Sequence, residues 1–330
     1  MIKLIYKISY LLIMKTSILV GGQAVIEGVM MRVPGAYATA LRLKDGKIIA
    51  KKYNFTSIIE KKGLKSFIII RGMFHLYESM KIGYQTLNWS ASIYEKEQGE
   101  RRKENSNTQI IMDYLGNILA ILFAISLFIL LPLFLTTSIV DDVNQPVYFN
   151  IISGSSRILI FISYLLIISQ LKDVKRLFEY HGAEHKTVYN FESGKELSSK
   201  EAQKFSTKHP RCGTSFIFII MLVTIFSYAI LDSIALIFIT ELTIPIRFIM
   251  HIICLPLVAG IGYEVLKFLA SKQHIKLFRY LSKPGLWLQS ITTKCPDEEQ
   301  IDVAIYALKE AFGDEFNKYA GKKFTAESIG

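Results

Sequence analysis

Residues 180–187 read YHGAEHKT and place two histidines, His181 and His185, four positions apart, with Glu184 directly before the second. On an α-helix, which turns about 100° per residue, these three side chains lie on one face. Two neutral imidazoles at this spacing can bind one divalent metal ion, and the neighbouring carboxylate can then act as a general base. The order H-x-x-E-H, that of inverted zinc-peptidase motifs, therefore predicts a zinc site with Glu184 as the base. The alternative is a helix end with two solvated histidines.

A second group of candidate ligands follows in HPRCG, which contains His209, Arg211 and Cys212. A histidine and a cysteine three positions apart can also donate to one metal ion, and both suit zinc. Arg211 could stabilise an anion next to such a centre. The simpler alternative is a proline-containing turn before a membrane helix, with Arg211 as an ordinary flanking cation.

The elements that must position these residues are long apolar runs. The chain has 330 residues, of which 51% are hydrophobic, and these are concentrated in runs with few charges. A membrane-spanning helix needs about 20 mostly apolar residues. Four runs meet this requirement and predict four spans: 114–140, about 147–171, 213–239 and 244–270.

The distribution of Lys and Arg predicts the orientation of these spans. The segment DDVNQP between the first two spans has neither residue, whereas 172–212 and 271–330 contain nine each. Because Lys and Arg favour the cytoplasmic side, both termini and 172–212 are expected in the cytoplasm. The net charge of +11 then faces one side, where it can attract anionic lipid or, less simply, a nucleic-acid or ribosome surface.

This topology brings the candidate ligands to one depth. HGAEH follows the cytoplasmic end of the second span, whose helix is expected to continue through LKDVKRLFEYHGAEHKTVYNF, and HPRCG precedes the third. Glu264 lies near the cytoplasmic end of the fourth span, where a carboxylate is costly unless it is paired or coordinating. We therefore expect the third ligand to be Cys212, His209 or Glu264. His251 lies at the opposite end of the fourth span and is excluded by the same reasoning.

The expected fold is a mainly α membrane protein, a four-helix transmembrane bundle with a small cytoplasmic β-containing N-terminal element and cytoplasmic helices. Alternating strand-like residues and the turns VPGA and KDGK predict the β element. An amphipathic pattern predicts a helix from Asp297 to Phe312 in the tail. Three cysteines give no disulfide framework. The predicted segments are an N-terminal extension at 1–16, the β element at 17–62, an interfacial or bundle-packed helix at 63–94, a charged linker at 95–112, the membrane domain at 113–270 with its motif loop at 172–212, and the helical tail at 271–330.

A third polar stretch, GGQAVIEGVMMR, places Glu27 and Arg32 among small and apolar residues. It lacks the glycine spacing of a phosphate-binding loop. An inward ion pair within the β element and a role in binding substrate or metal are both compatible with this pattern.

Four stretches together resemble the YqhQ-like family of bacterial multipass membrane proteins: GGQAVIEGVMMR, YHGAEHKTVYNFE, KFSTKHPRCGTSF and PGLWLQSITTKCPDEEQIDVAI. The resemblance extends from about Ile18 to Phe312. It implies a metal-dependent enzyme in the inner membrane of a bacterium and leaves the reaction open. The matching positions are His181, Glu184, His185, His209, Arg211, Cys212, Glu27 and Arg32.

Two functions of different classes follow. The first is a membrane-embedded, metal-dependent hydrolase of peptide bonds or lipid esters, with its site at the cytoplasmic interface and a divalent metal, zinc by its ligands, as cofactor. The second is a non-catalytic scaffold in which the cluster is a structural metal site or a polar staple. Its basic cytoplasmic face would recruit a protein partner such as the membrane-insertion machinery or a ribosome. In both cases the lipid bilayer is a partner, no specific nucleic acid is expected, and the oligomeric state is open.

Overall fold

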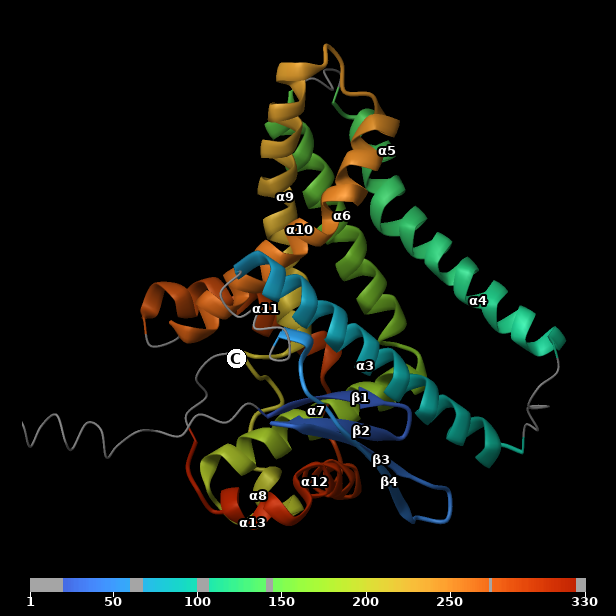
Figure 1. Cartoon of the computed structure of the whole chain (residues 1–330), viewed down its shortest axis with the longest axis vertical. Coiled ribbons are helices and arrows are strands. Elements are labelled where there is room, and N and C mark those ends of the chain that lie inside the picture. Colours follow the sequence, from blue (N-terminus) through green and yellow to red (C-terminus); the bar gives the residue numbers. More distant parts are fainter. Residues whose placement is uncertain (1–19, 60–67, 100–106, 141–144, 273–274, 325–330) are drawn as a thin grey trace, which may run out of the picture. The chain divides into compact units, whose positions relative to one another are not determined.

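A computed structural model of the chain describes residues 20–59, 68–99, 107–140, 145–272 and 275–324 (Figure 1). The predicted N-terminal extension at 1–16 lies outside these residues. The chain divides into two compact units. We call them the sheet unit, which comprises 1–56, 176–211 and 293–330, and the helical unit, which comprises 57–175 and 212–292.

The sheet unit contains an antiparallel sheet in the strand order β1-β2-β3-β4, which confirms the predicted N-terminal β element. Glu27 closes the first hairpin with a φ of 54°, a left-handed conformation that is uncommon for a residue other than glycine. Gly46 in KDGK has a φ of 84°, as the Asp-Gly turn predicts. The strands are β1 (Gly21–Val25), β2 (Gly28–Val33), β3 (Ala36–Arg42) and β4 (Ile48–Asn54).

One face of this sheet is buried by two helices. Helix α12 (Glu298–Phe312) starts at the N-cap Asp297, whose side chain forms a capping box with Gln300, and it packs on β2 and β3. Its apolar side forms one core with alternate residues of β2 and β3 and with the inner side of α7 (Lys172–Ser193). Shorter elements complete the unit: α8 (Ser199–Ala202), the 3-10 turn η3 (Gly313–Glu315) and α13 (Phe316–Tyr319).

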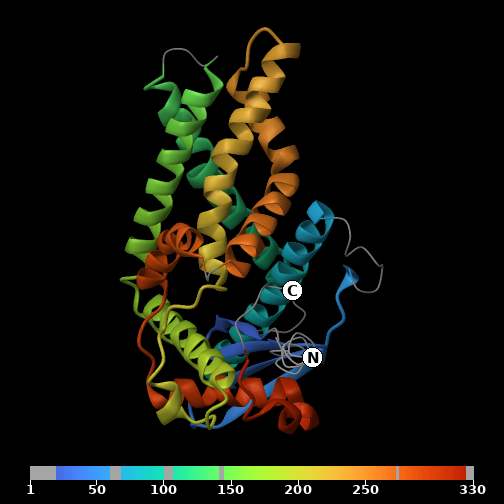
Figure 2. The same cartoon turned by 90° about the vertical axis from the view of Figure 1, so that its left-hand side faces the viewer.

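The helical unit contains four helices that are long and apolar enough to cross a membrane, as the sequence predicts (Figure 2). Many of their large apolar side chains are exposed, for example Phe226 at 68% and Ile253 at 72%. Such surfaces suit lipid and are rare on proteins that live in water. The candidate spans are 114–137, 146–168, 213–238 and 244–269. They lie in α4 (Asn107–Ile125) with the π-helical turn η2 (Ser126–Leu130) and α5 (Leu131–Thr137), in α6 (Pro146–Ile168), in α9 (Gly213–Phe238) and in α10 (Ile244–Ser271).

Helix α3 (Ile68–Glu97) packs against α10 through two glycines. A Cβ on Gly72 would come within 2.8 Å of the carbonyl oxygen of Gly260, so the absence of a side chain allows the backbones to approach closely. The predicted helix at 63–94 corresponds to α3, although residues 60–67 lie outside the described part. The predicted linker at 95–112 is shorter, because α3 continues to Glu97 and α4 begins at Asn107.

Two expectations about the helices need correction. The second span does not continue unbroken into HGAEH, because α6 ends at Ile168 and turns at 169–171 separate it from α7. The tail contains a helix that the sequence analysis missed, α11 (Lys276–Thr292), with Pro284 inside it. Pro284 and Gly285 usually interrupt helices, and this composition conceals α11.

A buried polar cluster joins three of the apolar helices. Oδ2 of Asp232 accepts hydrogen bonds from Asn150 Nδ2 at 2.7 Å and Arg247 Nη1 at 3.0 Å, and Oδ1 lies 2.8 Å from His251 Nε2. Asp232 and Arg247 are fully buried, and the guanidinium carbon of Arg247 lies 3.8 Å above the ring of Phe149. His251, which the depth argument excluded from the metal site, belongs to this separate cluster.

Candidate metal centre

Helix α7 presents His181 and His185 from neighbouring turns on one side. Their ring centroids are 4.5 Å apart. His185 is 1% exposed and Glu184 is 5% exposed, and both lie in the interior of a 22-residue helix. The motif is therefore not a solvated helix end. A buried carboxylate next to two imidazoles has to be compensated by positive charge, which is a property that metal centres share.

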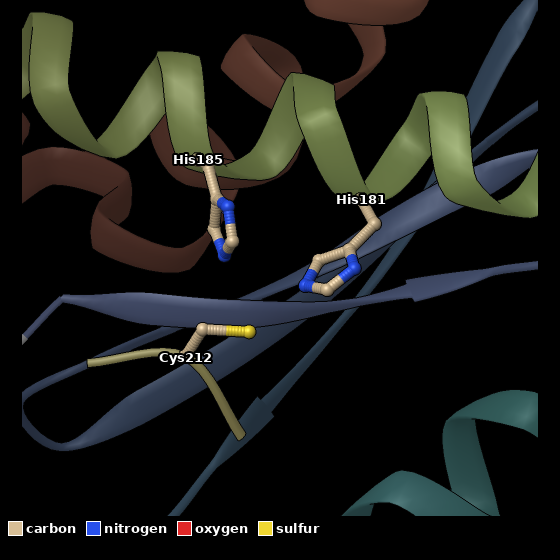
Figure 3. A group of neighbouring side chains, drawn as sticks. All are labelled: His181, His185 and Cys212. Atoms are coloured by element: carbon tan, nitrogen blue, oxygen red, sulfur yellow. The ribbon is translucent and has the colours of Figure 1, made fainter. Parts of the chain in front are cut away.

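Cys212 supplies the third candidate ligand. One ligand atom each from His181, His185 and Cys212 lies within 4.8 Å of the others, and Figure 3 shows the two rings and the sulfur directed toward one another. A peptide bond joins Cys212 to Arg211, the last residue of the sheet unit in this stretch. Cys212 is also the N-cap of α9, where its sulfur accepts a hydrogen bond from Thr214 N at 3.4 Å. A helix N-terminus favours the thiolate form that binds metals.

This set of donors fits a zinc-like ion. Two imidazole nitrogens and one thiolate sulfur are ligands that zinc commonly takes, and three protein ligands leave one tetrahedral position open. With bonds of about 2.0–2.3 Å, tetrahedral ligand atoms lie roughly 3.3–3.8 Å apart. Small side-chain rotations from the present separations reach that geometry. His209 and Glu264, the other two predicted third ligands, are not part of this group among the residues that the structure describes.

The second nitrogen of His185 is held by the backbone. His185 Nδ1 lies 2.5 Å from the carbonyl oxygen of Thr207. Because a carbonyl can only accept, this contact assigns the proton to Nδ1 and leaves Nε2 as the atom able to bind a metal. Nε2 lies 3.4 Å from a carboxylate oxygen of Glu184. A carbonyl that fixes the tautomer of a histidine ligand is a common feature of metal sites.

Gly22 of strand β1 makes room for Glu184. A Cβ on Gly22 would lie 2.9 Å from Cγ of Glu184, closer than such contacts normally come. Because Gly22 has no side chain, the carboxylate of Glu184 can stay beside His185. This gives Gly22 a role in shaping the centre.

Helix α7 holds the segment 194–211 by a series of side chains. Lys186 Nζ donates to the carbonyl oxygens of Gln203 at 2.6 Å and Phe205 at 2.7 Å. Tyr189 OH donates to the carbonyl oxygen of Lys208 at 3.1 Å, and Asn190 Nδ2 donates to that of Glu196 at 3.0 Å. These bonds place the Thr207 carbonyl against His185, so they connect loop conformation to ligand geometry.

Arg211 closes this segment by pairing with Glu192. The guanidinium donates to a carboxylate oxygen of Glu192, and both side chains are only 6% exposed. His209 is 4% exposed, and its Nε2 lies 3.9 Å from the same carboxylate. Burial lowers the pKa of His209; Arg211 and His185 also lower it, whereas Glu192 raises it. Arg211 thus binds a buried carboxylate, whereas the sequence analysis assigned it to an anion in the site. Glu192 was not recognised from the sequence, although it ends the YHGAEHKTVYNFE stretch.

Glu27 is engaged by α7 and not by its neighbour Arg32. Its carboxylate binds the guanidinium of Arg176 through both oxygens and lies 3.3 Å from Tyr180 OH. Hydrogen bonding to Glu27 raises the pKa of Arg176, and burial is the main cause that raises the pKa of Tyr180. Arg32 has its guanidinium carbon 4.5 Å from the ring centroid of Phe55. Of the two alternatives for this stretch, the ion pair of Glu27 with Arg32 is not formed, because the Glu27 carboxylate instead joins α7 to the sheet.

Glu264 has a different partner from the predicted metal. Both of its oxygens accept hydrogen bonds from Arg71 of α3, at 2.7 and 2.6 Å. Hydrogen bonding to this carboxylate raises the pKa of Arg71. The bidentate geometry satisfies the carboxylate that the sequence analysis considered costly. Its role is to join α3 to α10.

A short strap of the tail crosses α7 beside His181. Lys294 N donates to the carbonyl oxygen of Phe178 at 2.9 Å, and Gln203 Nε2 donates to that of Pro296 at 2.6 Å. A Cβ on Gly182 would collide with the Lys294 carbonyl oxygen, so glycine is needed between the histidine and the rest of the motif. The sequence gives no direct signal for this contact, because more than 100 residues separate its two sides.

Comparison with known proteins places the chain in a family whose members have no assigned activity. A family model described as "Protein of unknown function (DUF1385)" matches residues 67–314. The "Uncharacterized protein YqhQ" of Bacillus subtilis (strain 168) is 32% identical over 307 residues, which cover 88% of this chain and 91% of the relative. No solved structure gives a significant match. The chain belongs to the DUF1385 family and is a YqhQ-like protein.

Proposed function

We propose that this protein is a membrane-embedded hydrolase that depends on a divalent metal ion, with zinc as the best fit. The observation that carries the proposal is the convergence of His181, His185 and Cys212 with Glu184 beside them. Two imidazoles and one thiolate leave a coordination position open, which catalytic zinc sites need. A metal held there would polarise a substrate carbonyl and make a water molecule more acidic.

The residues of the chain then have separate roles. His181, His185 and Cys212 would hold the ion, and the Thr207 carbonyl would keep His185 in the right tautomer. Glu184 would accept a proton from the attacking water and pass it to the leaving group, as a general base and then a general acid. Arg211, paired with Glu192, would position Cys212 and would not bind the substrate.

We further propose that the four apolar helices cross the bacterial inner membrane and that the sheet unit lies on the cytoplasmic side. The support is the concentration of Lys and Arg in 172–212 and 271–330, together with their absence from DDVNQP. The centre would then lie at the cytoplasmic interface. Peptide bonds and lipid esters are the substrates within reach there.

Metal analysis of the purified protein tests the proposal. Wild-type protein should retain about one zinc ion per chain, as expected for one site of this kind. His185→Ala should lose it, and Glu184→Gln should retain it while losing hydrolysis of ester and peptide substrates. A wild-type protein that binds no divalent metal after reconstitution would refute the hydrolase.

The burial of Glu184 and His185 favours one competing proposal, a scaffold that uses the cluster as a structural metal site and recruits a partner through its basic face. A structural site is closed by four protein ligands, whereas a catalytic one exchanges a ligand. Cobalt-substituted protein should change its visible spectrum on addition of azide or a hydroxamate if a position is open. An unchanged spectrum would support the scaffold.

A further inference from the structure

Helix α11 lies across the spans instead of along them. In both views its axis runs crosswise to those of α6 and α9 (Figures 1 and 2). Its second half is docked on the bundle, where Leu288 shares a core with Leu165 of α6. Gln289 Nε2 donates to Ser215 Oγ at 2.8 Å, and a Cβ on Gly285 would lie 2.9 Å from Ser215 Cβ.

This docking fixes the level at which α11 crosses. Ser215 lies two residues after the start of α9, and Leu165 lies three residues before the end of α6. Both are ends of candidate spans. A helix that crosses two spans at their ends lies at the level where hydrocarbon gives way to lipid headgroups.

From Leu277 to Trp287, one apolar side of α11 is left uncovered by the described part of the chain. The spacing of 277, 280, 281 and 287 places these residues on one broad side of the helix, next to the side that is docked further along. Tyrosine and tryptophan are the residues enriched at membrane interfaces. The exposed fractions are 61% for Leu277, 62% for Tyr280, 53% for Leu281 and 54% for Trp287.

Basic residues flank this apolar side. Lys276, Arg279 and Lys283 are all exposed. The ammonium nitrogen of Lys283 lies 4.0 Å from the centroid of the Tyr280 ring, so charge and apolar surface are adjacent. No acidic residue occurs between 275 and 292. An apolar side bordered by Lys and Arg is the composition of helices that lie in the interface of anionic membranes.

We propose that the side of α11 that carries Leu277, Tyr280, Leu281 and Trp287 is embedded in the headgroup layer and binds anionic phospholipid. Leu277, Tyr280 and Trp287 would enter the upper acyl region, while Lys276 and Lys283 contact the phosphates. The proposal rests on the membrane placement of the helical unit, and it does not depend on any metal or activity. It gives the helix that precedes the strap at 293–296 a fixed position on the bilayer.

The two tryptophans of the chain, Trp89 and Trp287, make a direct test possible. A Trp89→Phe variant in lipid vesicles leaves Trp287 as the sole tryptophan, which can be excited selectively. Lipids brominated near the glycerol should quench it about twofold more than lipids brominated near the chain end, because interfacial helices penetrate about 5–10 Å. Acrylamide from the aqueous phase should quench it weakly.

Two reference variants distinguish contact of α11 with lipid from insertion of the helical unit into the membrane. In a Trp89→Phe, Trp287→Phe background, Phe226→Trp places the reporter in the middle of α9 and Tyr306→Trp places it in the sheet unit. Phe226→Trp should be quenched by deeply brominated lipid, whatever α11 does. If it is not, the membrane placement fails. If it is, and Trp287 is insensitive to every brominated lipid, the proposal for α11 is refuted, whether Trp287 is open to acrylamide or covered by a protein.

The lipid preference is tested with headgroup-matched quenchers. At equal mole fractions, brominated phosphatidylglycerol should quench Trp287 more than brominated phosphatidylcholine. The Lys276→Glu, Lys283→Glu variant should lose this preference, which corresponds to about fivefold in local enrichment for each lysine. The control exchanges Lys200→Glu and Lys322→Glu in the sheet unit and should retain it. Equal quenching by both lipids in the wild type would overturn the anionic part of the proposal.

Discussion

The Glu192→Gln variant tests whether the ion pair with Arg211 positions Cys212. Both side chains of the pair are 6% exposed. Removing one charge from a buried pair costs about 3–5 kcal/mol, because the other charge remains away from water. Nε and Nη1 of Arg211 are also buried without a hydrogen-bond partner in the described part of the chain, so Glu192 is the main compensation for this cation.

In Glu192→Gln, much of the cost of leaving Arg211 unpaired is avoided if the backbone before Cys212 moves so that the Arg211 guanidinium reaches water. Because Cys212 is the next residue, such a movement takes its sulfur away from His181 and His185. We therefore expect Glu192→Gln to weaken zinc binding about 10–100-fold, the range for lost partners behind metal ligands. This is about 1.4–2.7 kcal/mol, less than the full cost of an unpaired buried charge.

Competition with a chelating dye measures the zinc affinity, and the thiolate-to-cobalt charge-transfer band reports directly on Cys212. Glu192→Gln should diminish that band, and Cys212→Ser should abolish it. Glu196→Gln changes an exposed acid on the same segment and is the matched control. The positioning role is wrong if Glu192→Gln keeps both the wild-type affinity and the band.

A double variant separates positioning from general damage. Glu192→Leu with Arg211→Met removes both charges and leaves no cation to turn outward, and such replacements are often neutral or stabilising. It should recover thermal stability and most of the cobalt–thiolate band relative to Glu192→Leu alone. If the double variant is stable but the cobalt–thiolate band does not recover, then the contact between Glu192 and Arg211 positions Cys212 directly. In that case the displacement of an unpaired Arg211 is not the cause.

Three further outcomes follow from the geometry. Asp232→Ala leaves the fully buried Arg247 without its carboxylate, so the free energy of unfolding in detergent should fall by about 3–5 kcal/mol, and a change below 1 kcal/mol would contradict the pairing. Gly182→Ala forces a methyl group against the Lys294 carbonyl and should cost about 1–3 kcal/mol in thermal unfolding, whereas an unaltered melting temperature would show that the strap is loosely held. Zinc affinity should fall steadily as the pH is lowered, because the imidazole and thiol ligands must lose their protons to bind the ion, and a pH-independent affinity would exclude a site built from histidine and cysteine.

The apolar helices were the part of the fold that the sequence could predict. Uncharged runs of more than 20 residues have few stable alternatives to a spanning helix, and the ends of the four runs agree with the structure to within a few residues. The β element was predictable for a similar reason, because Asp45-Gly46 and alternating side chains specify a hairpin locally. Helix α11 was missed, since Pro284 and Gly285 act as local breakers while its docking on Ser215 is a tertiary interaction.

The metal centre was predictable in part. His181 and His185 follow from helical spacing, which is a local property. The choice among His209, Cys212 and Glu264 was not decidable from depth, because it depends on which partner each one finds. Glu264 is bound by Arg71, which is 193 residues away in sequence.

Charge balance connects the remaining cations to the proposal. Three basic residues near the motif are turned to other groups: Lys186 to two carbonyl oxygens, Arg211 to Glu192 and Arg176 to Glu27. Nε2 of His185, 3.4 Å from a carboxylate oxygen of Glu184, could carry positive charge toward it either as a second ring proton or as a bound metal ion. The ring proton compensates one negative charge, and a thiolate at Cys212 adds a second. A divalent cation on Nε2 of His185 would balance both, which favours the proposed metal over a proton as the partner of this buried group.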